Sequence, residues 1–197
     1  MRPSTNKTEL NPPDSCTSSA SQKIAGSHQS CLVGNFKKLY LGGKLKNRKR
    51  QFAMIDKEDY SRFSKFSWSL QEGVNTTYAV TAVSGSICGL HRLVMNLDIE
   101  DPREVDHRNH NGLDNRKCNL RVCTRSENMM NRYKSGTNIS GFKGVSYSCV
   151  RKKWRARINV DGKEIYLGCF SSEVIASKVY NLAAKKYFKE FACLNKI

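Results

Sequence analysis

Apolar and polar residues alternate in short runs from residue 34 onward, a pattern typical of β-strands. The runs are "KKLYL", "RQFAMID", "FSWSL" and "TYAVTAV", and Gly, Asn and charged residues separate them. Between them "KEDYSRFSKF" (57–66) predicts a short helix, and "LHRLVMNL" (90–97) predicts another with its apolar residues on one face. This part of the chain is therefore predicted to be β-rich, with two short helices.

A different pattern covers residues 105–132, which hold six asparagines and five arginines. A predicted strand ends in Asp106 and His107, and "NHNGLDNR" then supplies turn-forming residues. "NLRVCT" predicts a second strand, after which Thr124 and Glu127 have the spacing of a capping box that begins a helix through "SENMMNRY". The predicted order is strand, loop, strand, helix.

The C-terminal segment (141–197) contains three β-type runs, "GFKGVSYS", "KWRARINV" and "KEIYLGCF", followed by a long helix, "SEVIASKVYNLAAKKYFKEF". In the second run apolar residues alternate with Arg155, Arg157 and Asn159, so one face of the sheet is apolar and the other basic. A helical stripe through Ile175, Val179, Leu182 and Ala183 is predicted to cover the apolar face.

These patterns together predict an α+β protein in four parts. Residues 1–33 form a disordered tail rich in Ser, Thr, Asn, Pro and Gln, because such a segment has too few apolar side chains to offset its ordering entropy. Residues 34–134 form the β-rich domain with the strand–loop–strand–helix motif. A linker (135–140) follows, and residues 141–197 form a three-stranded antiparallel sheet packed on one helix.

The charge of the chain points to an anionic polymer as its partner. Lys and Arg number 34 against 17 acidic residues, a net charge of +17. Residues 34–88 carry +6 and residues 141–197 carry +8, whereas residues 89–140 between them carry only +2. The cluster "KLKNRKR" (44–50) suits a solvated loop and a phosphate contact equally well. We expect double-stranded DNA as the partner.

Two classes of protein are disfavoured. None of the eight cysteines forms a C-x-x-C pair, so a structural zinc site lacks its usual spacing, and a catalytic cysteine is not expected. The N-terminus has no apolar run behind a basic start, so we expect neither a secretory signal nor a membrane partner. We expect a cytoplasmic location.

The motif in 105–132 has the residue types of a metal-dependent hydrolytic site. If the hairpin packs against the helix, Asp106 and Asn128 converge and offer a carboxylate and an amide oxygen, an incomplete shell suited to Mg²⁺, or Mn²⁺, that completes its coordination with water and phosphate. His107 can take a proton from an attacking water. Because neighbouring strand residues face opposite ways, the strand has to end or bulge at His107.

The run "VDH…N…LDNR…NLR…SEN…N" resembles the HNH endonucleases, the ββα-metal nucleases of phages and homing elements, and "HRLVM" resembles their lead-in. The resemblance implies that Asp106 and Asn128 bind the metal and that His107 is the general base. It implies that Asn119 holds the loop by backbone hydrogen bonds. Two arginines would grip phosphate or brace the loop: Arg116 and Arg121.

Three positions leave alternatives open. His110 is a rival base, but it falls inside the turn and lacks an adjacent carboxylate. His91 matches the family's "HRL", and packing or a DNA-backbone contact explains it as well as catalysis does. The third letter of the motif is often His in the family, and here Asn128 fills it.

The C-terminal runs "GFKGV", "KW…I", "YLGCF" and "FACLN" resemble the APETALA-type (ethylene-responsive-factor-like) DNA-binding domain over nearly all of 141–195. That family carries arginines where Ser146 and Ser148 stand and a Trp at Tyr166, so the same target sequence is not expected. By position, the resemblance and the alternation in the second run assign DNA contact to Lys143, Ser146, Ser148, Arg151, Arg155, Arg157, Asn159 and Tyr166, with Arg116 added from the first motif.

The sequence therefore predicts a metal-dependent DNA endonuclease that a C-terminal domain positions. With one hydrolytic centre we expect a monomer that nicks; breaking both strands needs a second engagement or a dimer. One alternative is a DNA-binding regulator whose nuclease fold is inactive, but all four motif residues are present: Asp106, His107, Asn119 and Asn128. An RNA-binding module would need exposed stacking aromatics, and Tyr147 and Tyr166 alone support it weakly.

Overall fold

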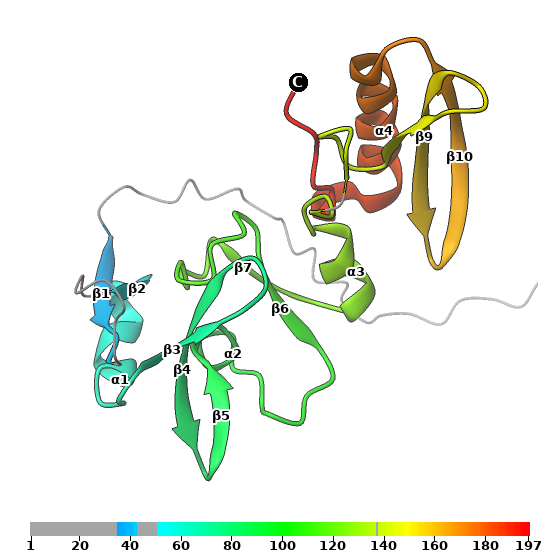
Figure 1. Ribbon diagram of the computed structural model, residues 1–197. Coiled ribbons are helices and arrows are strands. Elements are labelled where there is room, and N and C mark those ends of the chain that lie inside the picture. The colour runs from blue at the N-terminus through cyan, green and yellow to red at the C-terminus, as the bar shows by residue number, and fades with distance from the viewer. Residues whose placement is uncertain (1–34, 43–50, 137) are drawn as a thin grey trace, which may run out of the picture. The chain divides into compact units, whose positions relative to one another are not determined.

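The computed structural model describes residues 35–42, 51–136 and 138–197. The predicted tail (1–33) and the basic cluster "KLKNRKR" lie outside the described residues. The first described elements form an antiparallel pair, β1 (Phe36–Tyr40) and β2 (Phe52–Asp56), followed by η1 (Lys57–Asp59) and α1 (Tyr60–Phe63). The helix predicted between the second and third strand is thus confirmed as two short turns (Figure 1).

The second sheet has the order β3–β4–β5 and is antiparallel throughout; its strands are β3 (Ser69–Glu72), β4 (Thr77–Val83) and β5 (Ser86–Gly89). The predicted strand "FSWSL" begins only at Ser69, because Trp68 is buried and its Nε1 donates to the carbonyl of Phe63 at 2.8 Å. β5 was not predicted. It follows a two-residue turn in which Ser84 (φ 50°) and Gly85 (φ 81°) both have positive φ, the geometry that suits a tight hairpin.

The next elements are α2 (Leu90–Val94), the antiparallel pair β6 (Glu104–His107) and β7 (Leu120–Cys123), and α3 (Arg125–Met130). The predicted capping box is confirmed: the hydroxyl of Thr124 accepts from the backbone N–H of Glu127, and the carboxylate of Glu127 accepts from the backbone N–H of Thr124. The order strand, loop, strand, helix is therefore as predicted (Figure 1).

The C-terminal elements form an antiparallel sheet of order β10–β9–β8 covered by one helix. The strands are β8 (Val145–Ser148), β9 (Lys153–Val160) and β10 (Lys163–Phe170), and α4 (Glu173–Phe188) and η2 (Lys189–Phe191) follow. The predicted stripe on the helix was wrong at Ile175 and Leu182, which are 47% and 68% exposed, and right at Ala183, which is buried. Ala176, Tyr180 and Ala184 are also buried against the sheet. Small side chains let the helix lie close to β9, which also places the Tyr180 ring directly over Gly144.

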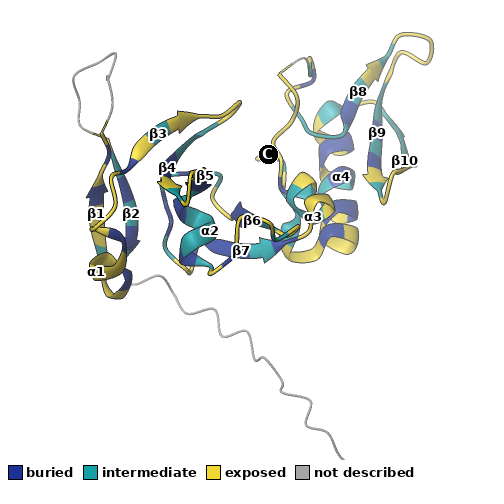
Figure 2. Cartoon of the chain, turned by 90° about the horizontal axis from the view of Figure 1, so that it is seen from below, coloured by how far each residue is buried: buried dark blue, intermediate teal, exposed yellow. Residues whose placement is uncertain are grey.

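The buried side chains form separate clusters in the two parts of the chain. One cluster joins residues from β1 to β7 and includes Phe63, Trp68 and Leu90; the others join α4 to β8–β10. Figure 2 shows buried positions on β6 and β7 and along α4. The fold is α+β, with several small sheets, and among the described residues no helix is long and apolar enough to cross a membrane.

Candidate active site

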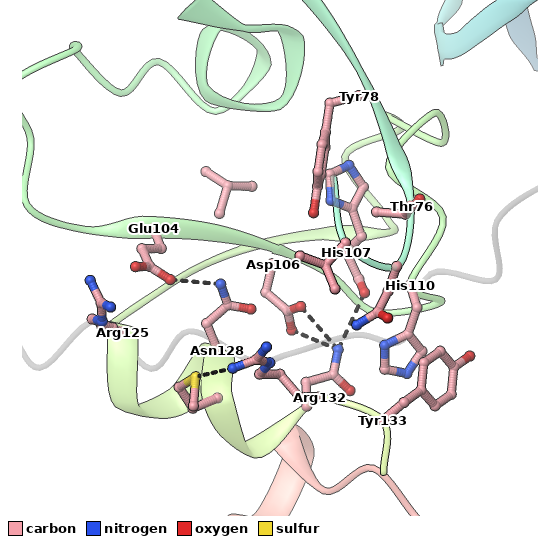
Figure 3. A pocket seen from close by; sticks show the side chains of 15 residues that line it. Thr76, Tyr78, Glu104, Asp106, His107, His110, Arg125, Asn128, Arg132 and Tyr133 are labelled. Carbon is pink, nitrogen blue, oxygen red and sulfur yellow. Dashed lines mark hydrogen bonds between the residues drawn. The ribbon is translucent and has the colours of Figure 1, made fainter. Parts of the chain in front are cut away.

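A pocket of about 390 Å³ lies between β6, α3, the start of β4 and the loop before it (Figure 3). Asp106, His107 and Asn128 all line this pocket, as the sequence predicts. β6 ends at His107, so the required interruption of the strand occurs there. The structure therefore brings the two predicted metal ligands and the predicted base to one place.

Asp106 is buried and held by two neighbours. Its Oδ2 accepts from Nε and Nη2 of Arg121, its cross-strand partner, at 2.8 and 2.6 Å. Nδ2 of Asn131 donates to both carboxylate oxygens at 3.0 Å. Since a carboxylate oxygen can accept two hydrogen bonds and Oδ1 accepts only one here, Oδ1 keeps a lone pair for another ligand.

Arg121 is buried among contacts with the rest of the chain. Its guanidinium bonds Asp106, donates to the backbone carbonyl of Glu190 and stacks on the ring of Phe191, with 3.9 Å between the guanidinium carbon and the ring centre. The side chain is only 7% exposed. Arg121 therefore holds Asp106 in place, which agrees with the predicted bracing role, and its catalytic role stays a prediction.

Arg116 also serves the loop. Its guanidinium makes two bonds of 2.7 Å to the carboxylate of Asp114, which is buried, and lies 5.7 Å from the ring of Phe36. This ion pair lowers the pKa of Asp114 below its ordinary value even though burial acts to raise it. These contacts agree with the predicted bracing role, and the DNA contact of Arg116 stays a prediction.

The asparagines of the motif satisfy the polar groups of the loop between β6 and β7. Oδ1 of Asn119 accepts from the backbone N–H of Asn109, and its Nδ2 donates to Oδ1 of Asn109 and to the carbonyl of Asp114. Asn115 is fully buried, and its Nδ2 donates to the carbonyl of Gly112. An amide carries both donors and an acceptor, so it can satisfy those backbone groups of the loop that the bridge between Met54 and Asp114 leaves unpaired.

His107 ends β6, and its ring packs among other side chains. Its Nε2 lies 3.4 Å from Oδ1 of Asn115, and because that oxygen can only accept, Nε2 carries the proton and Nδ1 carries the lone pair. The rings of Tyr78 and His91 pack beside it, with 5.9 and 5.3 Å between ring centres. Burial lowers the pKa of His107 below its ordinary value; the bond to Asn115 and the charge of Asp106 offset only part of this.

The two other histidines near the pocket have different surroundings. Burial lowers the pKa of His91 to about 3, and the charges of His107 and Arg92 act in the same direction, so a neutral packing role fits it better than a contact with DNA phosphate. His110 lines the pocket, but its ring stacks on Tyr133 with 3.9 Å between ring centres and its Nε2 lies 3.8 Å from Sγ of Cys193. Burial lowers the pKa of His110 below its ordinary value, and the charge of Asp106 offsets only part of this.

Asn128 completes the predicted oxygen pair. Its Nδ2 donates to Oε2 of Glu104 at 2.6 Å, and Figure 3 shows its amide oxygen on the side of Asp106. The described residues hold no cluster of three or more His, Cys, Asp and Glu that could bind a metal. The donors present, one carboxylate and one amide oxygen, suit a hard cation that keeps several positions for water and phosphate.

Several residues of the pocket were not identified from the sequence: Tyr78, Glu104, Arg125 and Arg132. Glu104 could have been found, because a residue two positions before Asp106 lies on the same face of a strand. Tyr78 comes from a distant hairpin and gives no local signal. The two arginines add positive charge around the pocket, which favours a phosphate-bearing ligand.

The outer face of the C-terminal sheet carries most of the predicted DNA contacts. The register pairs Ser146 with Arg155 and Tyr166 with Arg157, and by alternation the side opposite α4 holds Ser146, Ser148, Arg155, Arg157, Asn159 and Tyr166. Arg151 lies beside this face and bonds the hydroxyl of Tyr166. Lys143 lies elsewhere: it is half-buried, and its Nζ donates to the carbonyls of Met130 and Arg132 at 2.7 and 2.6 Å.

The chain is similar to known proteins, and the similarity includes the residues of β6, β7 and α3. The family model described as HNH endonuclease matches residues 88–130. An uncharacterized HNH endonuclease of Acanthamoeba polyphaga mimivirus is 31% identical over 154 residues, which are 76% of this chain and 77% of that protein. Protein 3.8 of Escherichia phage T7 is 37% identical over 60 residues, 30% of this chain and 50% of that protein. No solved structure matches.

Proposed function

The chain belongs to the HNH endonuclease family and is a DNA hydrolase, and on this premise we propose that it nicks double-stranded DNA with a divalent metal ion, Mg²⁺ or Mn²⁺, bound at a ββα-metal motif formed by β6, β7 and α3. The observation that carries the proposal is the convergence of Asp106, His107 and Asn128 on one pocket. The experiment that tests it is cleavage of a plasmid with and without the ion.

Asp106 and Asn128 would hold the ion through Oδ1 of each side chain. When bound, such an ion offsets the negative charge of the scissile phosphate and of the leaving 3′ oxygen. The chain prepares for it by keeping the Asp106 side chain fixed, since Arg121 and Asn131 bond the carboxylate and leave one oxygen accessible from the pocket.

His107 would act on the nucleophile. Its Nδ1 takes a proton from a water, the water oxygen bonds to phosphorus, and the bond from phosphorus to the 3′ oxygen breaks, after which that oxygen takes a proton from solvent. Tyr78 and His91 pack against the imidazole and fix its orientation. Arg125 and Arg132 at the edge of the pocket are positioned to contact neighbouring phosphates.

The pH dependence of cleavage should reflect the environment of His107. The base acts in its neutral form, so a lowered pKa extends full activity toward acid pH; a cation at Asp106 would lower this pKa further, which leaves the direction unchanged. We expect the midpoint of the fall in the single-turnover rate at saturating metal to lie below pH 6.5, the ordinary pKa of histidine. A midpoint above pH 6.5 would assign the base to another group.

The C-terminal residues 141–197 are proposed to be an APETALA-type DNA-binding domain that positions the nuclease domain (34–134). They carry +8, and the basic residues of their sheet lie on the face that α4 leaves free. An antiparallel sheet of this size fits the major groove of DNA, where arginines reach base edges and phosphates. The nuclease domain, with one hydrolytic centre, is proposed to act as a monomer.

The sheet face can be tested through the salt dependence of binding. If Arg155 neutralises one phosphate, Arg155→Ala should lower the slope of log affinity against log salt by about 0.9. The matched control is Lys178→Ala, which removes the same charge from an exposed position of α4. Fluorescence anisotropy over a range of salt concentrations measures both. Equal slopes for the two variants would show that DNA does not contact this face.

A further inference from the structure

Glu104 lines the pocket but has no role in the cleavage mechanism proposed above. It lies two positions before Asp106 on β6, so both carboxylates are on the same side of the strand. It is half-buried and lines both the catalytic pocket and an adjoining pocket of about 320 Å³. Figure 3 shows Asn128 between Glu104 and Asp106.

We propose that Glu104 is a positioning residue, which fixes the side-chain amide of Asn128 so that Oδ1, and not Nδ2, faces the metal position beside Asp106. The inference rests on the proposed function, in which Asn128 is a metal ligand. Glu104 itself does not touch the ion or the DNA.

The chemistry of the contact determines the orientation of the amide. A carboxylate accepts hydrogen bonds and has none to give, so only the Nδ2 end of Asn128 can bond Oε2 of Glu104 at 2.6 Å. The two ends of an amide point in different directions, and Oδ1 is therefore left facing Asp106. An amide nitrogen has no lone pair for a cation, so the opposite orientation would remove Asn128 from the metal shell.

Glu104 is needed because Asp106 favours the opposite orientation. In the metal-free protein the negative charge of Asp106 attracts N–H groups, as Asn131 shows by directing its Nδ2 at both oxygens of Asp106. Asn128 would turn its own Nδ2 the same way if nothing held it. The carboxylate of Glu104, on the opposite side of Asn128, accepts the Nδ2–H group instead and keeps Oδ1 of Asn128 toward the metal position.

The distance between Glu104 and Asn128 is set by rigid neighbours. Glu104 pairs with Cys123 in the β6–β7 ladder, and Sγ of Cys123 donates to the carbonyl of Glu104. The capping box at Thr124 begins α3 directly after β7, and the backbone N–H of Asn128 donates to the carbonyl of Thr124 at 3.0 Å. The bond between the side chains is therefore part of the motif and not a chance surface contact.

The test is the affinity of the full chain for Mn²⁺ without DNA, measured by calorimetry or by electron paramagnetic resonance. Glu104→Gln keeps the shape but can donate as well as accept, so it no longer fixes the amide, and we expect the affinity to fall about 10- to 100-fold, the usual effect of removing a group that orients a metal ligand. Glu100→Gln, which removes the same charge from an exposed position, should change it by less than about twofold.

A rescue experiment separates orientation from simple structural damage. Asn128→Asp has an oxygen at both ends and needs no orienting, but beside Glu104 it sets two carboxylates against each other and should weaken the site. In the Glu104→Gln background the same Asn128→Asp substitution should restore the affinity. A misfolded pocket would not make Asn128→Asp lower the Mn²⁺ affinity of the unaltered chain and raise that of the Glu104→Gln variant.

The outcomes distinguish this inference from the function on which it rests. If Asn128→Ala leaves Mn²⁺ affinity unchanged, Asn128 is not a ligand and the proposed metal site fails with the inference. If Asn128→Ala weakens binding but Glu104→Gln does not, or if the double variant is no better than Glu104→Gln, the positioning role is wrong and the metal site stands.

Discussion

Replacing His107 with alanine is expected to lower the single-turnover rate of DNA cleavage by about 10²- to 10⁴-fold, the usual contribution of a general base. DNA affinity should remain as it is, because the imidazole is 6% exposed and lies among Tyr78, His91 and Asn115, away from the protein surface. Rapid-quench kinetics on a labelled duplex and anisotropy titrations with the same DNA measure the two quantities.

The matched control is His110→Ala. His110 lines the same pocket but stacks on Tyr133, so its removal should reduce the rate by less than about tenfold. The reverse pattern, in which His110→Ala abolishes cleavage and His107→Ala does not, would transfer the base to His110. Loss of DNA binding by His107→Ala would show that the imidazole serves the structure instead of the chemistry.

Replacing Asp106 with asparagine is expected to have two large effects at once. It removes the proposed metal ligand, so cleavage should be lost at every Mg²⁺ concentration at which the unaltered chain is active. It also leaves the guanidinium of Arg121 buried without its partner, which typically costs about 3–5 kcal/mol. Chemical denaturation should therefore show a large fall in the free energy of unfolding.

The loss of stability can be reversed without restoring cleavage. In the double variant Asp106→Asn/Arg121→Met an apolar side chain of similar length takes the place of the unpaired cation, so most of the lost stability should return. Cleavage should stay absent, because the metal ligand is still missing. A double variant that cleaves DNA would show that Asp106 matters only through Arg121, and would exclude it as a ligand.

The hairpin and helix that carry the site were predictable because their signals are local. Turn-forming residues, strand alternation and the capping box at Thr124 all lie within a few residues of the elements they define. The stripe on α4 was not predictable in the same way. Leu182 fits an apolar stripe by its type, yet the sheet packs on Ala176 and Ala184, since the closeness of β9 selects small residues. Tyr180 fits there because its ring lies over Gly144.

Within the candidate site, the sequence predicted which residues meet in the pocket better than it predicted the side-chain bonds that hold them there. Asp106, His107 and Asn128 reach one pocket, but the bond from Arg121 to Asp106 depends on the strand register, and the ring of Phe191 comes from 70 residues further along. The spacing of residues does not reveal such long-range pairs. Because Phe191 and the Glu190 carbonyl brace Arg121, deletion of residues 141–197 would disturb the active site as well as DNA binding.

The most direct test of a metal-dependent nuclease centred on His107 is the conversion of supercoiled plasmid by the purified full chain. We expect open-circle DNA, formed before any linear product, in the presence of Mg²⁺ or Mn²⁺, with none in a chelator and none with His107→Ala. A plasmid that is bound but stays supercoiled with each of these ions would contradict it, and would make the chain a DNA-binding protein whose nuclease fold is inactive.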